Sequence, residues 1–323
     1  MPMQRRTLLV LAGCAAVGLP TTLSAQGAST TVVVPFPPGG GGDTLARAVL
    51  EPMGERLGEK VVVMNRPGAG GNIGTSQVAR AAADGRTFGY VTNGIMCVNP
   101  HLYGTKTLDP MRDLLPVGGL SVISLVMVLN PKALPGVTDF ASLMAKARRE
   151  PGVVTYASAG IGTTSHMAGA LLSARAGIEL THVPHAGGAA AVTEVLAGRI
   201  PFMIDVMPNV MPHIQAGTLK ALAVSTPERS PMLPDVPVFA ELGVKDCTIF
   251  AWDGFVAPKG TPDEVVRRFN RALNEVLADP AVTERLRRRG ALTAPGTPEA
   301  FAAFVTDEAP RWADLVKAVR PGQ

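Results

Sequence analysis

Short apolar segments alternate with amphipathic segments of helical period along most of this chain. The first pair is an apolar run at residues 31–35 and a helical pattern at 43–57, for which Asp43 is the expected N-cap. Strands that alternate with helices form βαβ units with mostly parallel sheets. The pattern therefore predicts an α/β fold. The other predicted strands lie at 61–64, 87–91, 120–129, 153–156, 180–183, 200–204, 219–224 and 250–256, and helices are predicted at 72–82, 139–149, 163–176, 189–197 and 209–216.

Three further helical patterns end the chain, at 263–277, 281–289 and from Phe301 onward. In the last one, aromatic and aliphatic residues recur at helical spacing as far as Val319, which is typical of a helix that packs on a core. Pro310 interrupts this pattern, and we expect it to kink or divide the helix.

The first 26 residues have the pattern of a secretory signal peptide. Arg5 and Arg6 precede an apolar run at 8–19, and Leu23-Ser24-Ala25 is typical of a cleavage site. The arginine pair also permits twin-arginine export, and the residues before Cys14 resemble a lipoprotein cleavage site, which would leave a lipid anchor there. Each reading places the mature protein outside the cytoplasm, and the simplest location is the bacterial periplasm.

Composition excludes several classes of function. A chain of 323 residues is long enough for two lobes, and no apolar segment after the signal peptide is long enough to span a bilayer. Without Arg5 and Arg6, 28 basic and 26 acidic residues remain, so no basic field attracts nucleic acid or an anionic membrane. Aromatic residues make up 5%, too few for base-stacking platforms.

Two cysteines, Cys97 and Cys247, lie in the mature chain. They lack the spacing of a zinc site or a redox pair. In an oxidising compartment they could form a disulfide, and two separate buried thiols are an equally good interpretation.

A glycine-rich corner at residues 35–43 joins the first predicted strand to the first helix. Consecutive glycines let backbone N–H groups approach a ligand closely, and a helix N-terminus adds unpaired N–H groups. The corner therefore predicts an anion site. It matches neither a dinucleotide fingerprint nor a P-loop, so we expect no cofactor. The candidate residues are Pro38, Gly39, Gly40, Gly41 and Gly42.

A comparable corner at residues 158–166 precedes a helix in the second half of the chain. It is rich in hydroxyl groups, some of which we expect to cap the helix, and it lacks the pattern of a nucleophile elbow. Neither corner contains Lys or Arg, so a small carboxylate would be held by N–H groups and by water. The candidate residues here are Ser158, Gly160, Gly162, Thr163 and Thr164.

Histidine and aspartate residues give weaker signals. His182 and His185 are three residues apart beside a predicted strand, which does not favour a metal site, and we expect none. Asp205 ends an apolar strand and is either a helix N-cap or a group that contacts a ligand. Asp205 and His185 do not form a set of nucleophile, base and orienting group with a known spacing, so an exported hydrolase or lyase is a weak alternative.

Six segments in this order resemble the Bug-type extracytoplasmic receptors of tripartite tricarboxylate transporters: 35–43, 67–75, 158–166, 182–188, 202–205 and 253–258. The resemblance covers essentially the whole mature chain. It implies a periplasmic-binding-protein (Venus flytrap) fold with two α/β lobes and two crossover strands. It also implies a receptor without catalytic activity that binds a small carboxylate or related solute between the lobes.

Carried onto this sequence, the resemblance implies one lobe at 31–125 plus 252–323 and a second lobe at 130–245. It adds Asn72, Thr75, Thr92, Asn93 and His185 to the candidate ligand contacts. The chain departs from the family at His185-Ala186-Gly187, where Tyr-Lys-Gly is common. A monomer that delivers its solute to a membrane permease is expected, and a receptor for a membrane signalling partner is the alternative.

Overall fold

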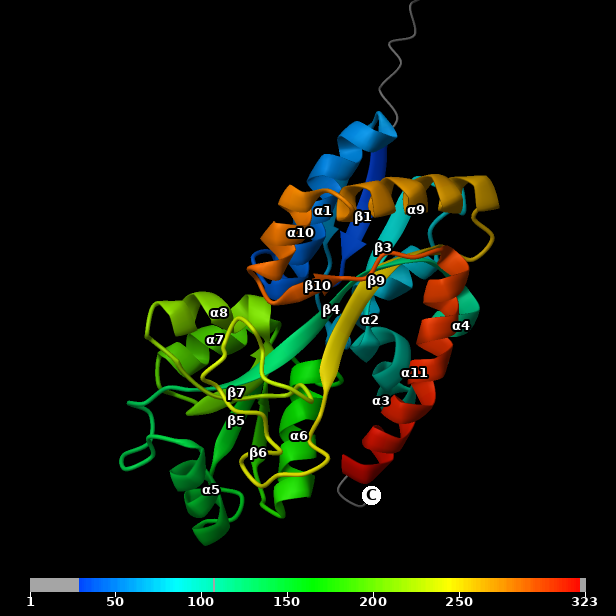
Figure 1. Cartoon of the computed structure of the whole chain (residues 1–323). Helices are drawn as coiled ribbons and strands as arrows, with labels where there is room; N and C mark the ends of the chain where they lie inside the picture. The colour runs from blue at the N-terminus through cyan, green and yellow to red at the C-terminus, as the bar shows by residue number, and fades with distance from the viewer. Residues whose placement is uncertain (1–28, 107, 320–323) are drawn as a thin grey trace, which may run out of the picture.

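The computed structural model describes residues 29–106 and 108–319, so the predicted signal peptide and Cys14 lie outside the described residues. The fold is built on one curled, mixed sheet with strand order β2-β1-β3-β9-β4-β7-β5-β6, and β8 and β10 pair with β4 (Figure 1). Parallel pairings lie in the two outer parts of the sheet, and the pairings of β4 and β9 in its middle are antiparallel. This confirms the predicted mixed α/β class.

The first outer part of the sheet consists of β1 (Ser29–Val34), β2 (Lys60–Asn65) and β3 (Thr87–Thr92). Helices α1 (Gly41–Leu57) and α2 (Asn72–Ala79) connect these strands. Val32, Val33 and Val34 of β1 are all buried, which is the pattern of a parallel strand covered on both faces.

The second outer part of the sheet repeats this organisation. It consists of β5 (Thr155–Ser158), β6 (Thr181–Pro184) and β7 (Phe202–Val206), with β8 (Lys220–Val224) paired to β4. The helices around it are α5 (Phe140–Arg149), α6 (Thr164–Ala176), α7 (Gly188–Leu196) and α8 (Met207–Gln215).

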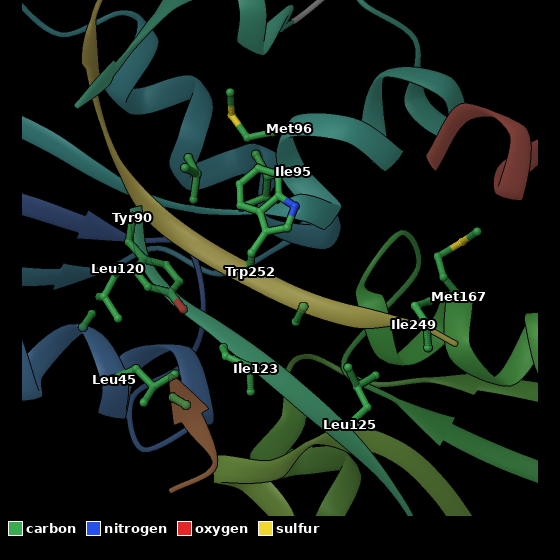
Figure 2. Packing of buried hydrophobic residues seen from close by; sticks show 14 of the residues in the cluster. Leu45, Tyr90, Ile95, Met96, Leu120, Ile123, Leu125, Met167, Ile249 and Trp252 are labelled. Atoms are coloured by element: carbon green, nitrogen blue, oxygen red, sulfur yellow. The ribbon is translucent and has the colours of Figure 1, made fainter. Parts of the chain in front are cut away.

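Strand β4 (Leu114–Leu129) joins the two parts, because its first eleven residues face β9 (Phe250–Pro258) and its last five face β7. Figure 2 shows buried side chains following β4 and β9 between the two parts, among them Ile123 and Trp252. One hydrophobic cluster includes residues as distant as Leu45 of α1 and Met167 of α6. The two lobes therefore share a continuous core along β4 and β9.

The last four elements are α9 (Asp263–Leu277), α10 (Pro280–Arg287), β10 (Ala291–Thr293) and α11 (Pro298–Val319). Of the two expected effects of Pro310, to kink or to divide the last helix, the structure rules out division, because α11 continues through this residue. Pro310 is exposed, and buried Val305 and Trp312 pack on either side of it. We infer that this burial offsets the one backbone hydrogen bond that proline removes.

Five short elements were not predicted from the sequence: the 3-10 turn η1 (Ala69–Gly71), the π-helical turn η2 (Gly94–Val98), α3 (Asn99–Tyr103), α4 (Pro110–Asp113) and β10. Each is too short for a periodic pattern to stand out. Within the described ranges, none of the helices combines the length and the apolar character that crossing a bilayer requires.

Candidate functional site

A cavity lies between the two lobes and encloses about 670 Å³ of space free of protein atoms, its opening included. Both lobes contribute to its wall, and none of the described residues that line it is Lys, Arg or His. The lining residues are Phe36, Pro37, Gly40, Gly41, Gly42, Leu45, Tyr90, Thr92, Asn93, Ile123, Ala159, Thr163, Thr164, Ser165, Gly188, Ala189, Asp205, Val206, Asn209, Ala251 and Trp252.

Three helices place their first two residues in the wall of this cavity: α1 from the first lobe, and α6 and α7 from the second. Helix α8 also begins here, with its N-cap Val206 and with Asn209 in the wall. The first N–H groups of a helix have no partner within it, and they carry the positive end of the helix dipole. Three such ends at one cavity favour an anion without any cationic side chain. The first-turn residues that line the cavity are Gly41 and Gly42 of α1, Thr164 and Ser165 of α6, and Gly188 and Ala189 of α7.

The glycine-rich loop before α1 is held by Asp43, although not as predicted. Gly40, not Asp43, is the N-cap of α1, because the helix begins at Gly41, two residues earlier than the sequence pattern indicates. The Asp43 carboxylate accepts hydrogen bonds from the Gly39 N–H at 2.9 Å and from the side chains of Arg47 and Asn65. Burial acts to raise the pKa of Asp43, but these hydrogen bonds together hold it below its usual value.

Hydrogen bonds cross from one lobe to the other around the cavity. The Gly41 N–H donates to Asn209 Oδ1 at 2.6 Å, and the Thr164 hydroxyl donates to Asn93 Oδ1 at 2.9 Å. Tyr103 Oη donates to the carbonyl of Ile161 at 3.1 Å. These contacts show the molecule with its lobes closed on the cavity.

Two buried polar groups of the first lobe lie at the cavity wall. Asn93 is fully buried, and its Nδ2 group has no hydrogen-bond partner within the described protein. Tyr90 Oη donates to Asp253, which also accepts from the backbone N–H and the hydroxyl of Ser121. Burial raises the pKa of Asp253 to about 6 despite these donors. A buried amide group without a partner is rare in folded proteins, and Asn93 is therefore a candidate donor to a ligand.

Asp205 lies at the cavity from the second lobe, at the end of β7. The N-cap of α8 is Val206, so the N-cap role predicted for Asp205 is wrong. Asp205 lies in the wall of the cavity, and its contact with a ligand stays a prediction. The carboxylate accepts from the Val206 N–H at 2.9 Å and from Asn209 Nδ2 at 2.7 Å. Burial raises its pKa to about 6, against the opposing effect of these two hydrogen bonds.

Eight predicted site residues are brought together at the cavity: Gly40, Gly41, Gly42, Thr92, Asn93, Thr163, Thr164 and Asp205. Gly160 and His185 line a neighbouring hollow that shares Phe36, Pro37 and Ala159 with the cavity, and Gly39 lines an outer groove beside α8.

The remaining predicted residues lie outside the cavity wall. Pro38 is exposed on the loop. Asn72 accepts from Asn99 Nδ2, and the Thr75 hydroxyl donates back to Gly71 O within its own helix turn. Ser158 Oγ lies 2.6 Å from His182 Nε2 and accepts from the Gly160 N–H, so it supports the second loop from behind. Gly162 faces Asn99 across the interface between the lobes.

Several lining residues were missed by sequence reasoning. Asn209, Ser165 and Gly188 stand in helix first turns whose start points the pattern placed one or two residues away. The pair Gly187-Gly188 could have predicted that α7 begins at a glycine-rich corner like those before α1 and α6. Ile123, Ala251 and Trp252 belong to the crossover strands, and only the three-dimensional fold brings these to the cavity.

Two stacked histidines stand behind the second loop. The rings of His166 and His182 have centroids 4.1 Å apart, and His182 also stacks on Tyr156. Burial lowers the pKa of His166 to about 4 and that of His182 to about 3, so both are neutral at physiological pH. Among the described residues, no cluster of three His, Cys, Asp or Glu could hold a metal ion.

Comparison with known proteins identifies the family. Residues 45–320 match the model of the tripartite tricarboxylate transporter family receptors. The chain is 41% identical over 291 residues to the UPF0065 protein in the tcbD-tcbE intergenic region of Pseudomonas sp., covering 90% of this chain and 86% of that protein. It is 37% identical over 287 residues to the protein BugT of Bordetella pertussis, covering 88% and 87%.

Solved structures agree in fold. An R. palustris protein solved with adipate is 35% identical, with a TM-score of 0.86, over 90% of this chain and 97% of that one. MatC from Rhodopseudomonas palustris with bound malate is 32% identical, with a TM-score of 0.84, over 89% and 98%. The two-lobed Venus flytrap fold is thereby confirmed. The chain therefore belongs to the Bug-type solute-binding receptors of the tripartite tricarboxylate transporter family.

Proposed function

We propose that this receptor captures a small carboxylate-bearing solute in the interlobe cavity and releases it chemically unchanged. The observation that carries the proposal is the convergence of three helix N-termini on a cavity whose described lining contains no cationic side chain. A carboxylate there would accept hydrogen bonds from first-turn N–H groups and from Asn93 Nδ2. The ligands named for two structural relatives, adipate and malate, belong to this chemical class.

Binding would be coupled to closure of the lobes, which we divide at 31–125 plus 252–323 and 130–245. A solute that contacts the N-termini of α1 and of α6 at once gains its full set of hydrogen bonds only in the closed form. It therefore shifts the population toward closure. The bonds Gly41–Asn209 and Thr164–Asn93 add to the stability of that form.

A thermal-shift screen of small acids tests the proposal, because a ligand that binds only the folded state raises its melting temperature. At least one mono- or dicarboxylate should stabilise the mature protein. Gly40→Trp should abolish that shift by filling the cavity. Gly40→Ala is the matched control, because a Cβ there would lie 3.5 Å from Pro37 O, which is an ordinary van der Waals contact. A broad acid panel without any stabiliser, or a full shift in Gly40→Trp, would contradict the proposal.

Mass spectrometry of the solute recovered after hours of incubation separates a receptor from a hydrolase or lyase. We expect the recovered acid to be unaltered. Conversion of the acid that depends on Asp205 would favour the enzyme instead.

The proposed location is the periplasm, after removal of residues 1–26, and the proposed partner is a membrane permease that receives the solute from the monomeric receptor. Intact mass of the protein from a periplasmic extract tests export, and a lipid attached at Cys14 would identify the anchored alternative. Uptake of the identified acid in cells with and without this receptor tests transport. Unchanged uptake, together with capture of a sensor's periplasmic domain, would indicate signalling.

A further inference from the structure

The cavity contains both hydrogen-bond donors and a hydrogen-bond acceptor, and the acceptor is the carboxyl group of Asp205. Helix N-termini and Asn93 Nδ2 offer hydrogen-bond donors. Asp205, which is only 2% exposed, is the one residue among those lining the cavity that can carry a negative charge at neutral pH. A cavity that takes a carboxylate thus already contains a carboxyl group of its own.

Asp205 is less completely satisfied than the other two buried aspartates near the cavity. Asp43 forms an ion pair with Arg47, and Asp253 accepts from one backbone and two hydroxyl donors. Asp205 has no ion pair in the described structure and accepts two hydrogen bonds, one on each oxygen. A carboxylate can accept about four. Two acceptor positions therefore remain in a group whose burial is costly.

The absence of a side chain at Gly188 makes room for the hydrogen bond between Asn209 and Asp205. A Cβ at Gly188 would lie 3.0 Å from Asp205 Oδ2 and 2.0 Å from Asn209 Nδ2, so a side chain at position 188 would displace this pair. Gly188 and Ala189, the first residues of α7, line the cavity together with Asp205.

A solute that carries only carboxylates would place a second anion in the cavity without neutralising the first. A hydroxyl or ammonium group on the solute would instead donate to Asp205, while the carboxylate binds the helix N-termini. On the basis of the proposed function, we propose that Asp205 makes the receptor selective for acids that carry a hydrogen-bond donor, hydroxyl or ammonium, next to a carboxylate. Asp205 is then a specificity-determining residue of the cavity.

Matched acids on the mature protein test this selectivity by titration calorimetry. Each series has one carbon skeleton with hydrogen, hydroxyl or ammonium beside a carboxylate: propionate, lactate and alanine; succinate, malate and aspartate; glutarate, 2-hydroxyglutarate and glutamate; 3-phenylpropionate, 3-phenyllactate and phenylalanine. In every series that binds, we expect a donor-bearing member to bind at least about tenfold more tightly than the unsubstituted acid, as suits a hydrogen bond to a charged group. The hydroxyl and ammonium members distinguish a neutral donor from a cationic one.

Two variants distinguish direct contact of Asp205 with the solute from a role of the Asn209–Asp205 pair in holding the lobes closed. Asp205→Asn removes the acceptor charge and also sets an amide against Asn209. Asn209→Ala removes the interlobe bond and one of the two donors to Asp205, but it keeps the Asp205 carboxyl group. We expect Asp205→Asn to reduce the preference within a series to about twofold. Asn209→Ala should weaken all three members by a common factor and keep the preference.

The outcomes distinguish this inference from the proposed function. If an unsubstituted acid binds wild type as tightly as its substituted partners, the proposed selectivity is wrong. The proposed function as a carboxylate receptor then still stands, and wild-type protein alone is enough to show this. Equal weakening of all members by Asp205→Asn reduces Asp205 to a positioning residue and also overturns it. If no acid of any series binds, the selectivity fails, and the broad acid panel decides whether the proposed function fails as well.

Discussion

The Gly41 amide at the start of α1 donates a 2.6 Å hydrogen bond to the side chain of Asn209 on α8, in the opposite lobe. The other end of that side chain donates to Asp205 at 2.7 Å. One amide side chain thus links the glycine-rich loop of the first lobe to the buried carboxyl group of the second. The link lies at the cavity itself, so closure and ligand contact are structurally coupled.

Asn209→Ala should weaken ligand binding without unfolding the protein. The bond to Gly41 forms only when the lobes close, and a hydrogen bond contributes about 1 kcal/mol net, which is about fivefold in affinity. Calorimetry with any acid found by the screen measures the loss. Gln215→Ala, an exposed position on the same helix, is the control and should change nothing. Equal affinity of the two variants would show that the bond does not contribute to closure.

Gly162→Ala should impair closure through a steric contact between lobes. Gly162 has φ +83°, and an added Cβ would lie 2.1 Å from Asn99 Oδ1 of the first lobe. Gly177 has φ +60° and no atom within 4 Å of the same Cβ position. Both substitutions strain the backbone by about 1 kcal/mol, but only the first obstructs the partner lobe.

Ligand affinity and unfolding free energy, measured on both alanine variants, separate these two effects. We expect a similar loss of stability in Gly162→Ala and Gly177→Ala, and at least about a tenfold loss of affinity in Gly162→Ala alone. A Gly162→Ala protein that binds like Gly177→Ala would mean that Asn99 moves aside at little cost.

Asp205 should make the ligand-free protein less stable as pH rises from about 4 to 6. Its folded pKa of about 6 lies above the unfolded value of 3.8, so in this window the folded state keeps a proton that the unfolded state has lost. One pKa unit corresponds to about 1.36 kcal/mol, which bounds the effect at about 3 kcal/mol.

Urea unfolding of wild type and Asp205→Asn at pH 4.5 and pH 7 measures this contribution. The variant should lose less stability than wild type between the two pH values. His166 and His182 act in the opposite direction below pH 6.5, because their lowered pKa values let the unfolded state bind protons first. Both histidines are present in both proteins, so the difference isolates Asp205. Identical pH profiles would show that Asp205 titrates normally in the fold.

The sequence was sufficient to predict the alternation of strands and helices and the two strand-to-helix corners, because both are local. Residues 31–35 and 43–57 carry the periodicity themselves, and consecutive glycines mark a corner wherever they occur. The start of α1 was misplaced by two residues because Asp43 is a good N-cap type, and in the fold its carboxylate binds Gly39, Arg47 and Asn65 instead.

The rest of the site depends on contacts between residues distant in the chain. Asn209 reaches Gly41 across 168 positions, and Tyr90 reaches Asp253 across 163. Nothing in the residues around Asn209 distinguishes it from any polar residue early in a helix. The crossover strand β4 brings Ile123 to the cavity only because it pairs with β9 and β7 at once.

Cys97 and Cys247 provide a last prediction, because the sequence left open whether they pair. In the structure both are buried free thiols. Burial raises the pKa of each to about 12, for Cys97 with a smaller contribution from Glu308, so the reactive thiolate is scarce at pH 8. Iodoacetamide at pH 8 should therefore leave the native mature protein, which lacks residues 1–26 and with them Cys14, unmodified and add two groups in denaturant without a reductant. A denatured protein that takes up the reagent only after reduction would mean that the two cysteines are joined by a disulfide.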